Sequence, residues 1–184
     1  MPEPSAVSPH DRPPFAAWPT QYAIANGTGR LWYVGAGTVC IQITAARGDV
    51  AMAKDYVAAI RAIRAMHHDD FVAASGIGMV QDFRSLHLAD KEAREYLNAA
   101  SRRDFARDEQ RFNKVAIREE LVLLRIALFL HGAAAARFGL LRVESVSDLE
   151  AEVEKLGLVP PQLGPDHDER VRAFETLAAR LRDA

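Results

Sequence analysis

Residues 38–66, TVCIQITAARGDVAMAKDYVAAIRAIRAM, decide the fold of this chain. The first part, residues 38–44, is rich in β-branched side chains and is long enough for a central strand. Asp49 then offers an N-cap side chain, and apolar residues recur at helical spacing as far as about Met66. The stretch therefore predicts a strand followed by an amphipathic helix.

The alternation of strands and helices continues on both sides of this stretch. Upstream, residues 21–25 and 31–34 are short β-type runs separated by Asn26-Gly27, a pair that tolerates the positive φ angles of a hairpin turn. Downstream, strands are predicted at residues 77–82, 112–117 and 140–146, and helices follow Asp90, Glu120 and Ser147. This order predicts an α/β fold, in which a mixed sheet has antiparallel strands at its N-terminal end and parallel crossovers through helices.

Proline, glycine and apolar patterning divide the chain into four parts. Residues 1–20 hold six of the nine prolines and predict a disordered or loosely attached arm. Residues 21–157 carry the α/β pattern, and residues 158–165 form a linker rich in Pro and Gly. Residues 166–184 predict a C-terminal amphipathic helix, and we expect its apolar stripe around Phe174 to dock, either on its own sheet or on a partner.

Composition and charge exclude several classes of function. The 184 residues include 23 Lys and Arg against 25 Asp and Glu, a net charge of −2, so nucleic acid is not an expected partner. The single cysteine, Cys40, cannot form a disulfide within the chain, which fits a reducing compartment. The longest apolar run, residues 121–136, is shorter than the about 20 residues of a membrane span and contains Arg125. We therefore expect a cytoplasmic protein with no membrane span and no cofactor.

The residues from 121 to 138 are apolar on almost every side and predict a helix that must be covered on several faces. Two ways of covering it stay open. The helix could mediate self-association as a homodimer, or the space between it and the sheet could hold an apolar small ligand.

Three segments, taken in order, resemble the STAS domain, the fold of the bacterial anti-sigma-factor antagonists. They are VCIQIT at residues 39–44, DFRSLHLAD at residues 82–90 and GLLRVESVSDLEA at residues 139–151. The resemblance implies a STAS-like sheet and a regulatory or protein-binding role. It departs from the antagonists at the phosphorylated serine, where this chain has Lys91, followed by Glu92. A lysine has no hydroxyl group to accept phosphate.

The candidate binding site is the junction between the strand at residues 77–82 and the next helix, at the carboxyl edge of a parallel sheet, where ligands of open α/β sheets bind. Its residues are Asp82, Arg84, Ser85, His87, Asp90 and Lys91. We expect this junction to bind a ligand or a protein partner without catalysis. A hydrolase at Ser85 and His87 is the weaker alternative, because the two residues are not part of a G-x-S-x-G elbow.

Two further polar segments have simpler interpretations. His67-His68-Asp69-Asp70 could ligate a metal, but neighbouring helical side chains point about 100° apart, so the segment is expected to be a structural helix end. Between residues 94 and 118, seven basic and four acidic residues alternate. This interleaving indicates a solvated charged surface rather than an anion site.

Overall fold

The computed structural model of the protein describes residues 15–104, 110–117 and 144–183. Its strands are β1 (Tyr22–Ile24), β2 (Gly29–Tyr33), β3 (Thr38–Ile43), β4 (Arg47–Gly48), β5 (Ile77–Asp82), β6 (Leu88–Ala89), β7 (Gln110–Ala116) and β8 (Glu144–Val146). Its helices are α1 (Val50–Met66), α2 (His68–Ala73), α3 (Lys91–Asp104), α5 (Leu149–Lys155) and α6 (His167–Leu181), with a short 3-10 turn, η2 (Ala25–Gly27).

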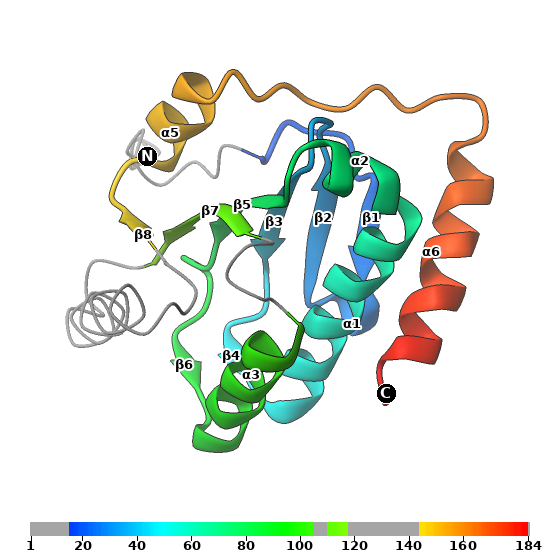
Figure 1. Cartoon of the computed structure of the whole chain (residues 1–184). Helices are drawn as coiled ribbons and strands as arrows, with labels where there is room; N and C mark the ends of the chain where they lie inside the picture. The colour runs from blue at the N-terminus through cyan, green and yellow to red at the C-terminus, as the bar shows by residue number, and fades with distance from the viewer. Residues whose placement is uncertain (1–14, 105–109, 118–143, 184) are drawn as a thin grey trace, which may run out of the picture.

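Six of these strands form one sheet in the order β1-β2-β3-β5-β7-β8 (Figure 1). The pairs β1–β2 and β2–β3 are antiparallel, whereas β3–β5, β5–β7 and β7–β8 are parallel. The predicted α/β class, with antiparallel strands first and parallel crossovers after them, is therefore confirmed. The turn between β1 and β2 is also as expected, because Asn26 and Gly27 have φ angles of 58° and 66°.

Each face of the sheet packs against its own apolar layer. On one face, Val39, Ile41 and Ile43 of β3 pack with the apolar side of α1. Helix α1 lies between α3 and α6 on this face (Figure 1). On the other face, Cys40 packs with Leu149 of α5. Strand β3 is buried along its whole length because successive residues point into these two layers.

The N-terminal segment contributes to the second layer. Phe15 and Trp18 are buried, with their ring centroids 5.2 and 5.8 Å from Trp32 of β2. The Trp32 indole Nε1 donates a 2.7 Å hydrogen bond to the carbonyl oxygen of Pro19. Residues 15–20 therefore belong to the packed domain, which corrects the sequence prediction of a loose arm over this part. Residues 1–14 lie outside the described residues.

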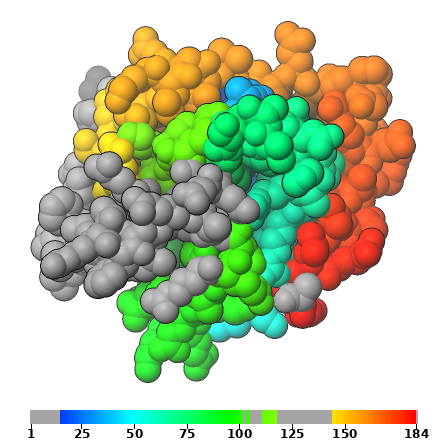
Figure 2. Space-filling view, in the orientation of Figure 1, coloured from blue at the N-terminus to red at the C-terminus, as the bar shows by residue number. Residues whose placement is uncertain are grey.

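Helix α6 packs against α1 of its own chain, and Figure 2 shows the two segments side by side. Phe174 is 1% exposed, and its ring lies 4.6 Å from that of Tyr22. Beyond the helix, the guanidinium of Arg182 pairs with the buried carboxylate of Asp55. That carboxylate also accepts a 2.7 Å hydrogen bond from Nδ2 of Asn26. The expectation that this amphipathic helix docks is confirmed, and it docks in cis.

Three local features differ from the sequence prediction. Asp148, not Ser147, caps α5, because its Oδ1 accepts a hydrogen bond from the Ala151 amide at 2.9 Å. Helix α2 and the two-stranded sheet formed by β4 and β6 were not predicted, since each is short and lacks a periodic pattern.

The predicted apolar helix at residues 121–138 lies outside the described residues, together with the dimer interface or ligand pocket that we expected on it. Within the described ranges, no helix has both the length and the apolar character that a membrane span requires.

Truncating Phe174 tests the packing of α6. Phe174→Ala should lower the free energy of unfolding by about 3–5 kcal/mol, because a fully buried aromatic ring is lost from the core. Chemical denaturation measures this change. The exposed neighbour Glu175, changed to Ala, is the control and should alter the stability by less than about 0.5 kcal/mol. Equal stability of the two variants would contradict docking in cis.

Candidate functional site

Asp82 is the last residue of β5 and organises the chain that follows it. It is 3% exposed, and β5 has β3 and β7 as neighbours at this position. Its Oδ1 accepts hydrogen bonds from the amide and the Nε of Arg84 at 3.1 and 2.9 Å, while Oδ2 accepts from Nη2 at 3.1 Å. This two-pronged ion pair folds the start of the loop back onto the end of the strand.

The remainder of the loop is tied to the segment that follows β3. The amides of His87 and Asp90 each donate a 2.8 Å hydrogen bond, to the carbonyl oxygens of Ala46 and Gly48 respectively. The pairing of β4 with β6 lies between these two bonds. Arg47 of β4 adds an ion pair, since its Nη2 lies 3.1 Å from both carboxylate oxygens of Asp90. Backbone and side-chain contacts therefore connect residues 83–90 both to the end of β5 and to β4.

The structure brings the predicted site residues together in two groups. Asp82 and Arg84 form the inner ion pair, and Asp90, immediately before α3, forms the outer one with Arg47. Ser85 and His87 are exposed on the loop between them. Lys91, the first residue of α3, is also exposed, and its Nζ lies 3.6 Å from Glu95 one turn along the helix.

Both carboxylates of the junction pair with arginine, Asp82 with Arg84 and Asp90 with Arg47. Leu88 of β6 lies between Arg84 and Asp90 in the sequence. It is an apolar side chain, and it is 58% exposed. The side chains of Ser85, His87 and Leu88 are exposed on this loop.

A buried chain of hydrogen bonds behind the junction was missed by sequence reasoning. The Tyr56 hydroxyl of α1 donates to Oε1 of Gln81, and Nε2 of Gln81 donates to Oδ1 of Asn113 on β7 at 2.5 Å. Burial raises the pKa of Tyr56 well above its ordinary value, so the hydroxyl keeps its proton. These contacts fix α1 against β5 and β7. Single polar residues within apolar runs, such as Gln81 next to Val80, were the signal in the sequence.

The side chains of His67 and His68 have different surroundings. The His67 ring stacks on Tyr33 at 3.9 Å, and its Nδ1 lies 3.3 Å from Asp70 Oδ2. His68 is exposed and faces a cavity beside α2. In the described part of the chain, His, Cys, Asp and Glu side chains form no group of three or more that could hold a metal ion.

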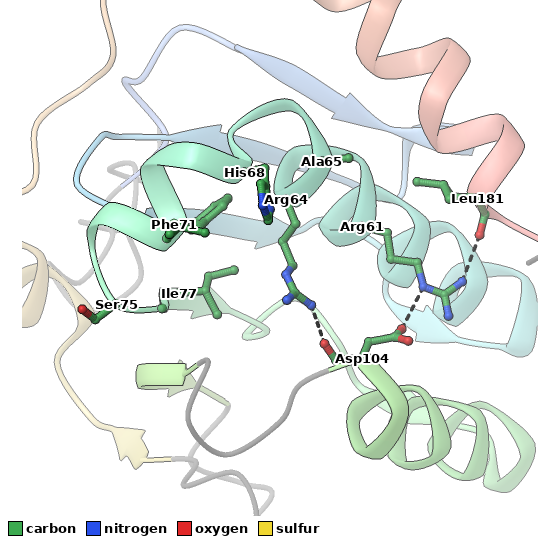
Figure 3. Close-up of a pocket in the computed structure, with 11 residues that line it drawn as sticks. Arg61, Arg64, Ala65, His68, Phe71, Ser75, Ile77, Asp104 and Leu181 are labelled. Carbon is green, nitrogen blue, oxygen red and sulfur yellow. Dashed lines mark hydrogen bonds and ion pairs between the residues drawn. The ribbon is translucent and has the colours of Figure 1, made fainter.

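That cavity is the second candidate site, and it lies at the opposite edge of the sheet, where β5 begins at Ile77 (Figure 3). Its volume is about 530 Å³, within the range of about 300–1,000 Å³ that is usual for small-molecule pockets. Arg61 and Arg64 of α1 reach into it beside Asp104. Arg61 and Arg64 are three residues apart, a spacing that places their side chains on the same face of α1.

Comparison with known proteins adds no relative. The chain matches no protein-family model, and searches of curated proteins and of solved structures also find no match. The functional argument therefore depends on the residues and their geometry.

Removing the charge of Asp82 tests the inner ion pair. Asp82→Asn should destabilise the protein by about 1–3 kcal/mol, because the guanidinium of Arg84 loses its buried ionic acceptor. Amide hydrogen exchange should accelerate across residues 83–90. Lys91→Ala is the control, since its exposed ion pair with Glu95 contributes less than about 1 kcal/mol. Unchanged exchange in the Asp82 variant would show that the loop does not depend on this pair.

The environment of His67 predicts a pH dependence of stability. Burial lowers the pKa of His67 below its ordinary value, and nearby Arg170 lowers it further, against the opposing effect of Asp70. The unfolded chain then binds the proton more readily than the folded protein does, so this contribution is present above about pH 6.5 and is lost as the pH falls toward the folded pKa. Denaturation curves at about pH 7.5 and about pH 5 should differ less for His67→Phe than for the wild type. If the stability of the variant and of the wild type changed equally between the two pH values, His67 would not be a source of the pH dependence.

Proposed function

We propose that this chain is a non-enzymatic STAS-like module that binds a protein partner, a second copy of itself included, through the loop at residues 83–90. The single observation that carries the proposal is the construction of that loop. Two arginine–carboxylate pairs and the pairing of β4 with β6 fix its backbone, while its outward side chains stay exposed. A loop fixed before binding loses little conformational entropy when a partner docks on it.

The arrangement of the sheet supports a STAS-like fold. Two antiparallel strand pairs precede three parallel ones, and the crossover from β3 to β5 runs through α1. The segment DFRSLHLAD, which resembles the family's strand-to-helix junction, ends one residue before α3 and lies at the carboxyl edge of the sheet. That edge is where open α/β sheets receive their ligands.

The first turn of α3 supports a binding role without phosphate control. Lys91 begins the helix, where the antagonists carry their phosphorylated serine, and Glu92 follows it in the first turn. Neither side chain can be phosphorylated in the way a serine is. Partner binding through this module is therefore constitutive rather than switched by a serine kinase.

Leu88 is the residue that tests the proposed surface. Leu88→Asp should reduce partner binding at least tenfold, because it places a charge on the exposed apolar centre of the loop. Val159→Asp is the matched control, since Val159 is 66% exposed and lies in the segment between α5 and α6. Both variants should keep the stability of the wild type.

Native mass spectrometry of the full chain purified from its own cells measures the binding. We expect a complex with a second copy or with another protein, which Leu88→Asp dissociates and Val159→Asp preserves. A wild-type protein that is monomeric and carries no bound protein would contradict the proposal. A small molecule retained in place of a protein would instead favour a ligand-binding function.

A further inference from the structure

His67 lies at the junction of β2, α1 and α2, beside the amino end of α6. It follows α1 and precedes α2, and its ring stacks on that of Tyr33 of β2. Helix α6 runs antiparallel to α1, since Arg182 at its far end pairs with Asp55 near the start of α1 (Figure 1). The first turns of α6 therefore lie toward the end of α1 where His67 is, and Arg170 is the cation there that acts on the imidazole.

The two nitrogens of the His67 ring have different surroundings. Nδ1 lies 3.3 Å from Oδ2 of Asp70, whereas Nε2 is buried and has no hydrogen-bond partner in the described part of the chain. A neutral imidazole with its proton on Nδ1 donates to Asp70 and leaves Nε2 as an acceptor. A second proton would have to bind at Nε2, where its N–H group would be buried without an acceptor.

Arg170 adds a positive charge from α6 to this environment. Its Nε is also buried without a hydrogen-bond partner among the described residues, while its Nη2 lies 3.1 Å from Oδ1 of Asp166. The side chain of His67 is 17% exposed, so water screens the repulsion between an imidazolium and this guanidinium only in part. The arrangement suits a neutral His67.

We propose that His67 is an acid-sensitive contact that controls how firmly the amino-terminal turns of α6 dock on the rest of the domain. While the imidazole is neutral, Arg170 lies beside an uncharged ring. Protonation puts a second cation near Arg170 and an unpartnered N–H group at Nε2, and both effects favour release of residues 167–172. The burial that disfavours the imidazolium also lowers the pKa of His67, so release begins below the ordinary pKa of histidine, about 6.5.

The other titratable groups at this contact modify the effect without cancelling it. Asp70 of α2 attracts the imidazolium, and it does so whether or not α6 is docked, because it belongs to a different element. Asp166 offsets part of the charge of Arg170. Tyr33 stays neutral in this pH range, because burial raises its pKa above the ordinary value of 10.0.

The remainder of α6 keeps anchors that do not involve His67. Phe174 is 1% exposed and packs on Tyr22, and Arg182 pairs with Asp55 at the opposite end of the helix. The proposed release is therefore confined to the turns that adjoin the segment between α5 and α6. It is independent of the loop at residues 83–90.

Hydrogen–deuterium exchange of the full chain, followed by mass spectrometry, measures the release. Exchange is compared at about pH 7.5 and about pH 5, each corrected for the intrinsic rate at that pH. We expect protection of peptides from residues 166–174 to fall by at least about threefold at the lower pH, because the released state binds the proton more readily than the docked state. Peptides from β3 are the internal control and should keep their protection.

Three variants identify the group responsible. His67→Phe keeps an aromatic ring on Tyr33 but cannot be protonated, so α6 should stay protected at about pH 5. His68→Phe is the matched control, since His68 is the exposed neighbour, and it should behave as the wild type does. Arg170→Met removes the facing cation and should reduce the loss of protection, provided that its exchange at about pH 7.5 shows a docked helix.

Three results would overturn the proposal. They are unchanged protection of α6 in the wild type between the two pH values, an equal loss in the wild type and in His67→Phe, and a loss in β3 as large as that in α6. The last result would indicate global unfolding instead of a local release. None of these results depends on Leu88, so this contact and the proposed protein-binding loop are tested separately.

Discussion

The fold depends on the parallel pairing of β5 with both β3 and β7. All six residues of β5 are buried, and a parallel strand cannot be joined to its neighbour by a tight turn. Each crossover must therefore leave the sheet, and both faces of the sheet must be covered. Helix α1 covers the centre of one face. On the other face, Phe15 and Trp18 pack in the same layer as Leu149 of α5, so a segment before the first strand is part of the core.

The two ends of β5 have different consequences for function. At its carboxyl end, the chain must turn back toward the start of α3, and Asp82 makes this turn by binding Arg84. At its amino end, the last turns of α1 meet the end of α3 near Ile77 and leave a cavity. The central strand thus separates the loop at residues 83–90 from the cavity beside α2.

The elements whose sequence has a clear period could be predicted, whereas contacts between residues far apart in the sequence could not. The runs of β-branched residues and the helical spacing after Asp49 predicted β3 and α1, because a buried strand and a two-faced helix each impose their own period. The position of the candidate site residues at the carboxyl edge of the sheet could be predicted from the order of strands and helices along the chain. The packing of Phe15 on Trp32 could not be predicted, since the prolines around Phe15 give no period. The pairing of Arg47 with Asp90, 43 residues apart, likewise leaves no local pattern.

Arginine–carboxylate pairs connect the segments of this molecule at several points. Arg84 pairs with Asp82 at the end of β5, and Arg47 pairs with Asp90 just before α3. Arg61 and Arg103 both contact the carboxylate of Asp104. The interleaved charges of residues 94–118 were interpreted as a solvated surface because sequence order says nothing about Arg61, which comes from α1. Folding brings that cation to Asp104, and the connection it makes between α1 and α3 is a property of the tertiary structure alone.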